Sequence, residues 1–146
     1  MHELLQDSTV RLYFLCAAIL VLKMAFTGSA TGVVRMRRGA YVTPEDYAFM
    51  GKHAAPPDEA VERLRRVHQN DLENIIPFLI IAFPYVLSGP SFRVAAGLLV
   101  VFTLARLLHT VTYLASMQPW RSIFYELGQI SMVVTAILLL VNILAA

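Results

Sequence analysis

The amino-acid sequence predicts an all-α integral membrane protein whose helices pack as a four-helix bundle. Of the 146 residues, 58% are hydrophobic and 15% are charged, with a mean hydropathy of +0.62, which lies outside the range of ordinary water-soluble domains. A bilayer core about 30 Å thick is crossed by roughly 20 mostly apolar helical residues. The chain has four such stretches, at residues 12–34, 72–88, 94–114 and 122–145. Residues 1–146 are therefore expected to form a single four-span domain.

The first apolar stretch, residues 12–34, is expected to be a retained membrane span. It is long, Lys23 interrupts it, and no small-residue cleavage site follows it, so it does not fit a signal peptide. Its single cysteine, Cys16, excludes a disulfide within the chain and is expected to be a small packing residue. The formal net charge of +2 is too small to suggest binding to nucleic acid.

The basic residues predict the orientation in the membrane. The connection between the first and second spans carries seven of them: Arg35, Arg37, Arg38, Lys52, Arg63, Arg65 and Arg66. The turn after the second span carries only Arg93. The positive-inside rule places the first connection in the cytosol, and both termini on the opposite side. Taken singly, the arginines of this connection are explained by topology and by contact with lipid headgroups.

Two helix starts are predicted within this connection. In the segment TPED, Thr43 is expected to cap a short helix, Pro44 to occupy its first position and Asp46 to complete a capping box, with Gly51 as the stop. A second helix is predicted from residue 58 to about residue 87, with acidic residues in its first turn. At 1.5 Å per residue it is ~45 Å long, so its charged first turns project from the membrane.

Polar residues recur at helical spacing in three of the spans. Residues three, four or seven apart share one face of a helix. The members of these ladders are Arg66, Asn70, Glu73 and Pro77 in the second span, Arg106, His109 and Tyr113 in the third, and Ser122, Tyr125 and Gln129 in the fourth. Each ladder alone is explained by contacts between helices. The alternating topology places all three at one depth, which predicts a shared polar pocket.

The residues of this pocket favour a particular ligand chemistry. Arginine side chains match carboxylates and a glutamate matches an ammonium group, so a small zwitterion with more carboxylates than amines is predicted. A metal ion is not expected, because one histidine and one glutamate on different helices fall short of an ordinary ligand set. The spacing also contains no serine protease triad and no phosphate-binding glycine loop.

The segment ERLRRVHQNDLENIIPF resembles the signature of the MAPEG family, the membrane-associated proteins in eicosanoid and glutathione metabolism. Supporting similarities are TPED, ARLLHTVTYL and WRSIFYELGQ, and the resemblance extends over most of the chain. LENIIPF and LSGP look like the transferases of the family, whereas Arg121 and Ser122, followed by Tyr125 and Gln129, look more like its synthases. The resemblance implies a homotrimer that binds glutathione between neighbouring subunits.

Residue by residue, the resemblance implies a glutathione site lined by Arg66, Asn70, Glu73, His109, Tyr113, Arg121, Ser122, Tyr125 and Gln129, with Arg35 reaching in from the adjacent subunit. The third-span ladder adds Arg106 as a further cation. The sequence differs from the synthases of the family at two places that affect glutathione binding and the rim of the site. Gln69 stands where the synthases have an arginine, and the loop before Arg121 is one residue shorter.

The expected chemistry is activation of the glutathione thiol as a thiolate. Arg121 is the predicted catalytic cation, because a permanent positive charge favours a thiolate strongly where the dielectric is low, and Ser122 is expected to donate a hydrogen bond to the sulfur. The predicted substrates are a lipophilic electrophile, a lipid hydroperoxide or a prostaglandin endoperoxide. Asp46 is a candidate proton carrier for the last of these, although a helix cap is the preferred reading.

Two other functions remain as alternatives: a non-enzymatic, lipid-binding membrane scaffold of the same fold, and, less favoured, a transporter subunit. The transporter reading has little support, because the polar ladders occupy only one half of the membrane depth. The expected location is the endoplasmic reticulum in a eukaryote or the inner membrane in a bacterium, with the active site facing the cytosol.

Overall fold

The chain folds into long antiparallel helices. In the computed structural model, which describes residues 3–51, 53 and 55–145, the elements are η1 (Leu4–Gln6), α1 (Ser8–Arg38), α2 (Pro44–Phe49), α3 (Glu59–Leu87), α4 (Phe92–Leu114) and α5 (Trp120–Leu144). Within these described ranges, α1, α3, α4 and α5 are long and apolar enough to cross a membrane. The predicted all-α, multi-pass membrane architecture is confirmed.

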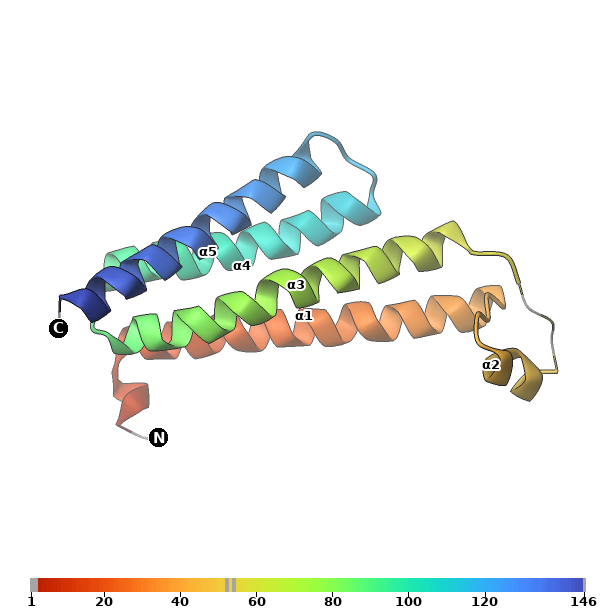
Figure 1. Ribbon diagram of the computed structural model, residues 1–146, viewed down its shortest axis with the longest axis horizontal. Coiled ribbons are helices and arrows are strands. Elements are labelled where there is room, and N and C mark those ends of the chain that lie inside the picture. The colour runs from red at the N-terminus through yellow and green to blue at the C-terminus, as the bar shows by residue number, and fades with distance from the viewer. Residues whose placement is uncertain (1–2, 52, 54, 146) are drawn as a thin grey trace.

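The four long helices form two pairs (Figure 1). Helix α1 packs against α3, and α4 packs against α5, while contacts of α1 with α4, of α3 with α5 and of α3 with α4 join the two pairs. The short helix α2 and the α4–α5 connection lie at one end of the bundle, and both termini lie at the other. The ends of the helices that carry the polar ladders therefore lie at the same level.

Two of the long helices, α1 and α3, begin at an aspartate whose side chain caps the first turn. Asp58, which was predicted to lie in the first turn of α3, is its N-cap, because its Oδ1 accepts hydrogen bonds from the amides of Ala60 (2.9 Å) and Val61 (3.2 Å). Asp7 caps α1 in the same way. Helix α1 ends at Gly39, whose φ of +63° lets its N–H reach the carbonyls of the last turn.

Helix α2 corrects one prediction. Thr43 is its N-cap and Pro44 its first residue, as predicted, but the Thr43 side chain makes no capping hydrogen bond. The backbone carbonyl of Thr43 instead accepts from the amides of Asp46 (3.1 Å) and Tyr47 (3.3 Å). The reciprocal capping box is therefore wrong, because two backbone contacts already close this single turn. Gly51 has a φ of +61°, in keeping with its predicted role as the stop.

The end of the bundle near the termini has an apolar core. The rings of Phe78 on α3 and Phe102 on α4 stack at 3.6 Å between centroids, and both are fully buried. Leu20 and Leu99 are buried beside them, and Cys16 is buried in the same cluster. The predicted packing role of Cys16 is confirmed. This half of the bundle is stabilised by close apolar packing.

Toward the other end, the core becomes charged. Lys23 of α1 forms an ion pair with Asp71 of α3, and the Asp71 side chain is completely buried. The Thr27 hydroxyl donates to the second carboxylate oxygen of Asp71 at 3.4 Å. Arg106 of α4 is also completely buried and interacts electrostatically with Asp71. One carboxylate therefore balances two buried cations from two different helices.

Asp7 gives the fold a pH dependence at low pH. Hydrogen bonds from the amides of Val10 and Thr9 hold the pKa of the Asp7 carboxyl below its usual value of 3.8. The unfolded chain takes up the proton first, so the stabilisation is complete above pH 3.8 and is lost as the pH falls through the lowered pKa. Thermal unfolding in detergent should therefore show a stability gap between wild type and Asp7→Ala that narrows on acidification. Asp7→Asn keeps a capping side chain that does not titrate, so the difference in stability between Asp7→Asn and Asp7→Ala should not change with pH. If the difference between wild type and Asp7→Ala is also independent of pH, the assignment of this pH dependence to Asp7 is wrong.

The buried charges predict an order of stability between two variants. Asp71→Asn leaves two buried cations without a counter-charge, and breaking a buried pair in this way typically costs roughly 3–5 kcal/mol. Lys23→Met leaves Asp71 still facing Arg106, so its loss should be smaller. Unfolding of the purified variants in detergent measures both changes. An equal or larger loss for Lys23→Met would mean that Arg106 does not depend on Asp71.

Candidate functional site

Three helices close around a polar cavity at the charged end of the bundle. The cavity has a volume of about 270 Å³ and is lined by Asn70 of α3, His109 and Tyr113 of α4, and Arg121, Ser122, Tyr125 and Glu126 of α5. Six of these seven residues are predicted site residues. The structure therefore brings members of all three sequence ladders together around one cavity.

Arg121 lines this cavity and is held by contacts with Tyr113 and Gln118. Its guanidinium lies 4.8 Å from the centre of the Tyr113 ring, within the range of a cation–π contact. With its amide oxygen turned toward Arg121, Gln118 accepts hydrogen bonds from Nε (3.1 Å) and Nη2 (2.6 Å). Ser122 follows directly and lies 3.2 Å from the same amide. A permanent cation and a hydroxyl donor thus sit side by side.

The aromatic wall of the cavity surrounds His109. The His109 ring meets Tyr113 edge to face at 5.6 Å and lies 6.0 Å from the Tyr125 ring. Only 3% of His109 is exposed. The cavity is thereby walled by rigid rings on its α4 and α5 sides.

Arg106 lies behind the cavity and does not line it. It is completely buried and donates to the Asn70 side-chain oxygen (3.1 Å) and to the Tyr125 backbone carbonyl (2.9 Å). Gly128 leaves it room: a Cβ there would lie 2.7 Å from Nε of Arg106, inside contact distance. The sequence ladder grouped Arg106 with the ligand-facing cations, whereas its contacts make it a residue that positions Asn70 and Tyr125.

Gln129 also belongs to the support of the cavity. Its Nε2 donates to the Tyr125 hydroxyl (2.7 Å) and to Oδ1 of Asn74 (2.8 Å). Asn74 in turn donates to the backbone carbonyl of Asn70 at 2.7 Å. Sequence reasoning missed Asn74, although it follows Asn70 by four residues on the same helix face.

Arg66 and Glu73 lie elsewhere on α3. Both are exposed in the single chain. Arg66 pairs with Glu59 at 3.0 Å, and Glu73 accepts a hydrogen bond from Gln69 at 2.9 Å. Gln69 stands where the synthases of the family have an arginine. It donates this hydrogen bond to Glu73, the carboxylate that was predicted to bind glutathione. Within one chain these residues do not reach the cavity.

Arg35 and Asp46 meet at a separate place. They line a second cavity of about 240 Å³ between α1 and α2, together with Gly32, Met36, Tyr41, Phe49 and Met50. The Nε of Arg35 is buried there and has no hydrogen-bond partner among the described residues. Helix α2 lies on the side of α1 away from α4 and α5 (Figure 1). Arg35 and Asp46 are therefore not brought to the first cavity within one chain.

Glu126 is the site residue that sequence reasoning missed. The Glu73 carboxylate was the predicted acid, but Glu126 lines the cavity. Its position four residues after Ser122 was the available signal. Among the described residues, no group of three or more histidine, cysteine or acidic side chains is placed to hold a metal ion.

Comparison with known proteins agrees with this architecture. The sequence model of the MAPEG family matches residues 13–141. The chain is 41% identical over 130 residues to prostaglandin E synthase of Bos taurus, covering 88% of this chain and 85% of that protein. It is 38% identical over 134 residues to microsomal glutathione S-transferase 1 of Mus musculus, covering 88% and 86%.

A third relative is prostaglandin E synthase of Homo sapiens, which is 39% identical over 135 residues and is covered over 87% of its length. These similarities extend over the membrane helices and the cavity that they enclose. Together with the match of the family model, they show that the chain belongs to the MAPEG family.

Proposed function

We propose that this protein is a glutathione-dependent membrane enzyme, which holds the glutathione thiol as a thiolate and either transfers it to a lipophilic substrate or uses it to isomerise one. The observation that carries the proposal is the presence of Arg121 and Ser122 in the lining of a polar cavity within a membrane bundle. Relatives named as a glutathione S-transferase and as a prostaglandin E synthase support it.

The residues of the cavity fit the chemistry of glutathione. Glutathione brings two carboxylates, one ammonium group and a thiol with a pKa near 8.5. Arg121 supplies a cation and Glu126 a carboxylate for the ammonium group, while Asn70, Ser122 and Tyr125 offer neutral hydrogen bonds. In this proposal, Arg121 stabilises the thiolate at low dielectric, and Ser122 donates a hydrogen bond to it.

One chain does not supply all the cations that two carboxylates call for. Arg121 is the arginine that lines the cavity, whereas Arg35, Arg66 and the acid Glu73 lie on other surfaces. We therefore propose that glutathione binds between the subunits of a homotrimer, with Arg35 contributed by a neighbour. The buried, unpaired Nε of Arg35 supports a ligand-facing role for this side chain.

Asp46 shares the cavity of Arg35 and would approach the site from the same neighbour. This arrangement supports a role for Asp46 as a proton carrier when an endoperoxide is isomerised. Conjugation of electrophiles and reduction of lipid hydroperoxides need no such group. The orientation we propose places this end of the bundle in the cytosol, at the endoplasmic reticulum of a eukaryote or the inner membrane of a bacterium, because the arginines cluster there.

Replacing Arg121 tests the catalytic assignment. Arg121→Gln removes the cation that stabilises the thiolate, so turnover of a halogenated nitroaromatic with glutathione should fall by roughly 100-fold or more. The apparent pKa of the bound thiol, followed by thiolate absorbance against pH, should rise toward about 8.5. Arg121→Lys keeps a positive charge and should retain more activity. Full activity in Arg121→Gln, with an unchanged thiol titration, would show that another group activates the thiol.

Mixed oligomers test whether the site is shared between subunits. Arg121→Ala and Arg35→Ala should each lose activity alone, but co-assembly should restore about one intact interface in four if neighbouring chains contribute the two arginines. Mixing Arg121→Ala with the Arg35→Ala/Arg121→Ala double variant controls for assembly and should restore nothing. If the first mixture stays inactive while mixed oligomers form, the shared site is refuted.

A further inference from the structure

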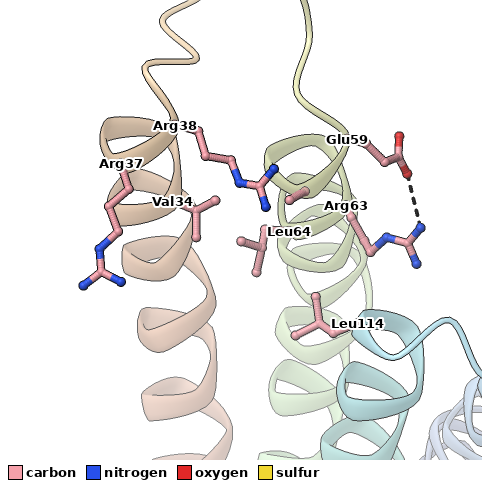
Figure 2. Close-up of a pocket in the computed structure, with 8 residues that line it drawn as sticks. Val34, Arg37, Arg38, Glu59, Arg63, Leu64 and Leu114 are labelled. Carbon is pink, nitrogen blue, oxygen red and sulfur yellow. Dashed lines mark hydrogen bonds and ion pairs between the residues drawn. The ribbon is translucent and has the colours of Figure 1, made fainter.

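A cavity of about 700 Å³ lies between α1 and α3, apart from the proposed glutathione site (Figure 2). It is formed where α1 ends, α3 begins and α4 ends. Its lining residues are Val34, Arg37, Arg38, Glu59, Ala60, Arg63, Leu64 and Leu114. None of them lines the cavity that contains Arg121.

The cavity has an apolar floor and a charged rim. Figure 2 shows Val34 and Leu64 facing each other between α1 and α3, with Leu114 below them. The Arg38 guanidinium extends into the gap above these side chains, whereas Arg37 runs down the outer side of α1. Leu114 is 39% exposed, so the floor continues onto the outer surface of the bundle. A ligand that matches both parts must be amphiphilic.

The rim carries a surplus of positive charge. Three arginines and one glutamate line the cavity, a formal balance of +2. Glu59 is shared between Arg63 (3.3 Å) and Arg66 (3.0 Å). Arg38 pairs with Asp58 at 3.1 Å, but its side chain is 55% exposed, and such surface pairs are weak. Among the described residues, Arg37 has no acidic partner within 4 Å. The rim is thus open to an external anion.

We propose that this cavity binds the headgroup of an anionic phospholipid, with the phosphate at Arg38 and the first part of an acyl chain along Val34, Leu64 and Leu114. Arginine matches a phosphate through paired N–H groups. The site lies where the apolar stretch of α1 gives way to its basic last turn, which is the level of lipid headgroups. A soluble phosphate would gain nothing from the apolar floor.

The proposed lipid site adjoins the glutathione site through one residue. Arg63, on the rim, donates to the Tyr113 backbone carbonyl at 3.4 Å and to the Ser116 hydroxyl. Tyr113 also lines the Arg121 cavity. The rim thereby fixes the end of α4 that carries part of the active site.

The test is lipid binding to the full-length protein in detergent, titrated with dioleoyl phosphatidylglycerol and followed by native mass spectrometry. Wild type should bind this lipid in preference to dioleoyl phosphatidylcholine. The Arg37→Gln/Arg38→Gln double variant should bind it roughly 25-fold more weakly, at about fivefold for each arginine. Arg65→Gln, which removes one positive charge from α3 outside the cavity, should bind like wild type.

Asp58→Asn provides a test in the opposite direction. Asparagine keeps the cap of α3 but releases Arg38 from its ion pair, so phosphatidylglycerol should bind more tightly to this variant. Val34→Phe fills the floor without changing charge and should weaken binding. Circular dichroism and glutathione turnover in lipid-free detergent establish that each variant is folded.

Several results would overturn the proposal. Equal binding of the two lipids, or a loss of free energy per removed charge in Arg65→Gln equal to that in the double variant, would indicate general surface electrostatics. Competition by glycerol 3-phosphate at the concentrations at which the lipid binds would indicate a site for free anions. Unchanged binding in both Asp58→Asn and Val34→Phe would exclude this cavity as the site.

Discussion

The position of one buried guanidinium, that of Arg106, determines how the charged half of the bundle is arranged. Removing an arginine from water is costly unless its donors are paired and a counter-charge lies near. Here the Asn70 side chain and the Tyr125 carbonyl accept from its two terminal nitrogens, Nε has no hydrogen-bond partner among the described residues, and Asp71 supplies the negative charge. These partners come from α3 and α5, so α3, α4 and α5 are fixed to one another at a single level. Gly128 is part of the same constraint, since a side chain there would occupy the space of the guanidinium.

This arrangement fixes the polar side chains of the cavity in position within the membrane bundle. Behind the cavity, Arg106 and Gln129 hold Asn70 and Tyr125 by direct hydrogen bonds. Arg121, which lines the cavity, is held between Gln118 and the Tyr113 ring. Arg106 is fully buried and Gln129 partly buried, whereas Arg121 is partly exposed and Ser122 is exposed. Preorganised dipoles and charges of this kind stabilise an anion without reorganising when it forms, which is the requirement for holding a thiolate.

The sequence predicts the helices better than it predicts their contacts. Apolar length gives the four spans, and Asp58 marks the start of α3, because both depend on local chemistry. Helical spacing also predicts that Asn70, His109 and Tyr125 share a level. It does not say which neighbour a face meets, so Arg106 was grouped with the ligand-facing cations although it lies behind the cavity. For the same reason Lys23 appeared only as an interruption in an apolar stretch, whereas its partner Asp71 lies 48 positions away on another helix. Glu126 was missed because Glu73 had already been assigned as the one carboxylate that pairs with the ammonium group of the ligand.

The remaining charges on α3 bear on the proposed assembly. Arg66 and Glu73 are exposed on one chain, at the level where the helix enters the apolar part of the bundle. Ionisable side chains facing lipid at such a depth are costly, and they usually face a bundle interior or a watery cavity. A neighbouring subunit placed against this face of α3 would remove Arg66 and Glu73 from lipid. If the same neighbour also brought its Arg35 to the Arg121 cavity, the second cation would be supplied without placing two arginines in one buried site. In such an assembly, each chain would fold with Arg121 as the one arginine in the lining of its cavity. The other charged side chains would be brought to the site only when the subunits associate, so the free-energy cost of burying the charges would be divided between folding and assembly.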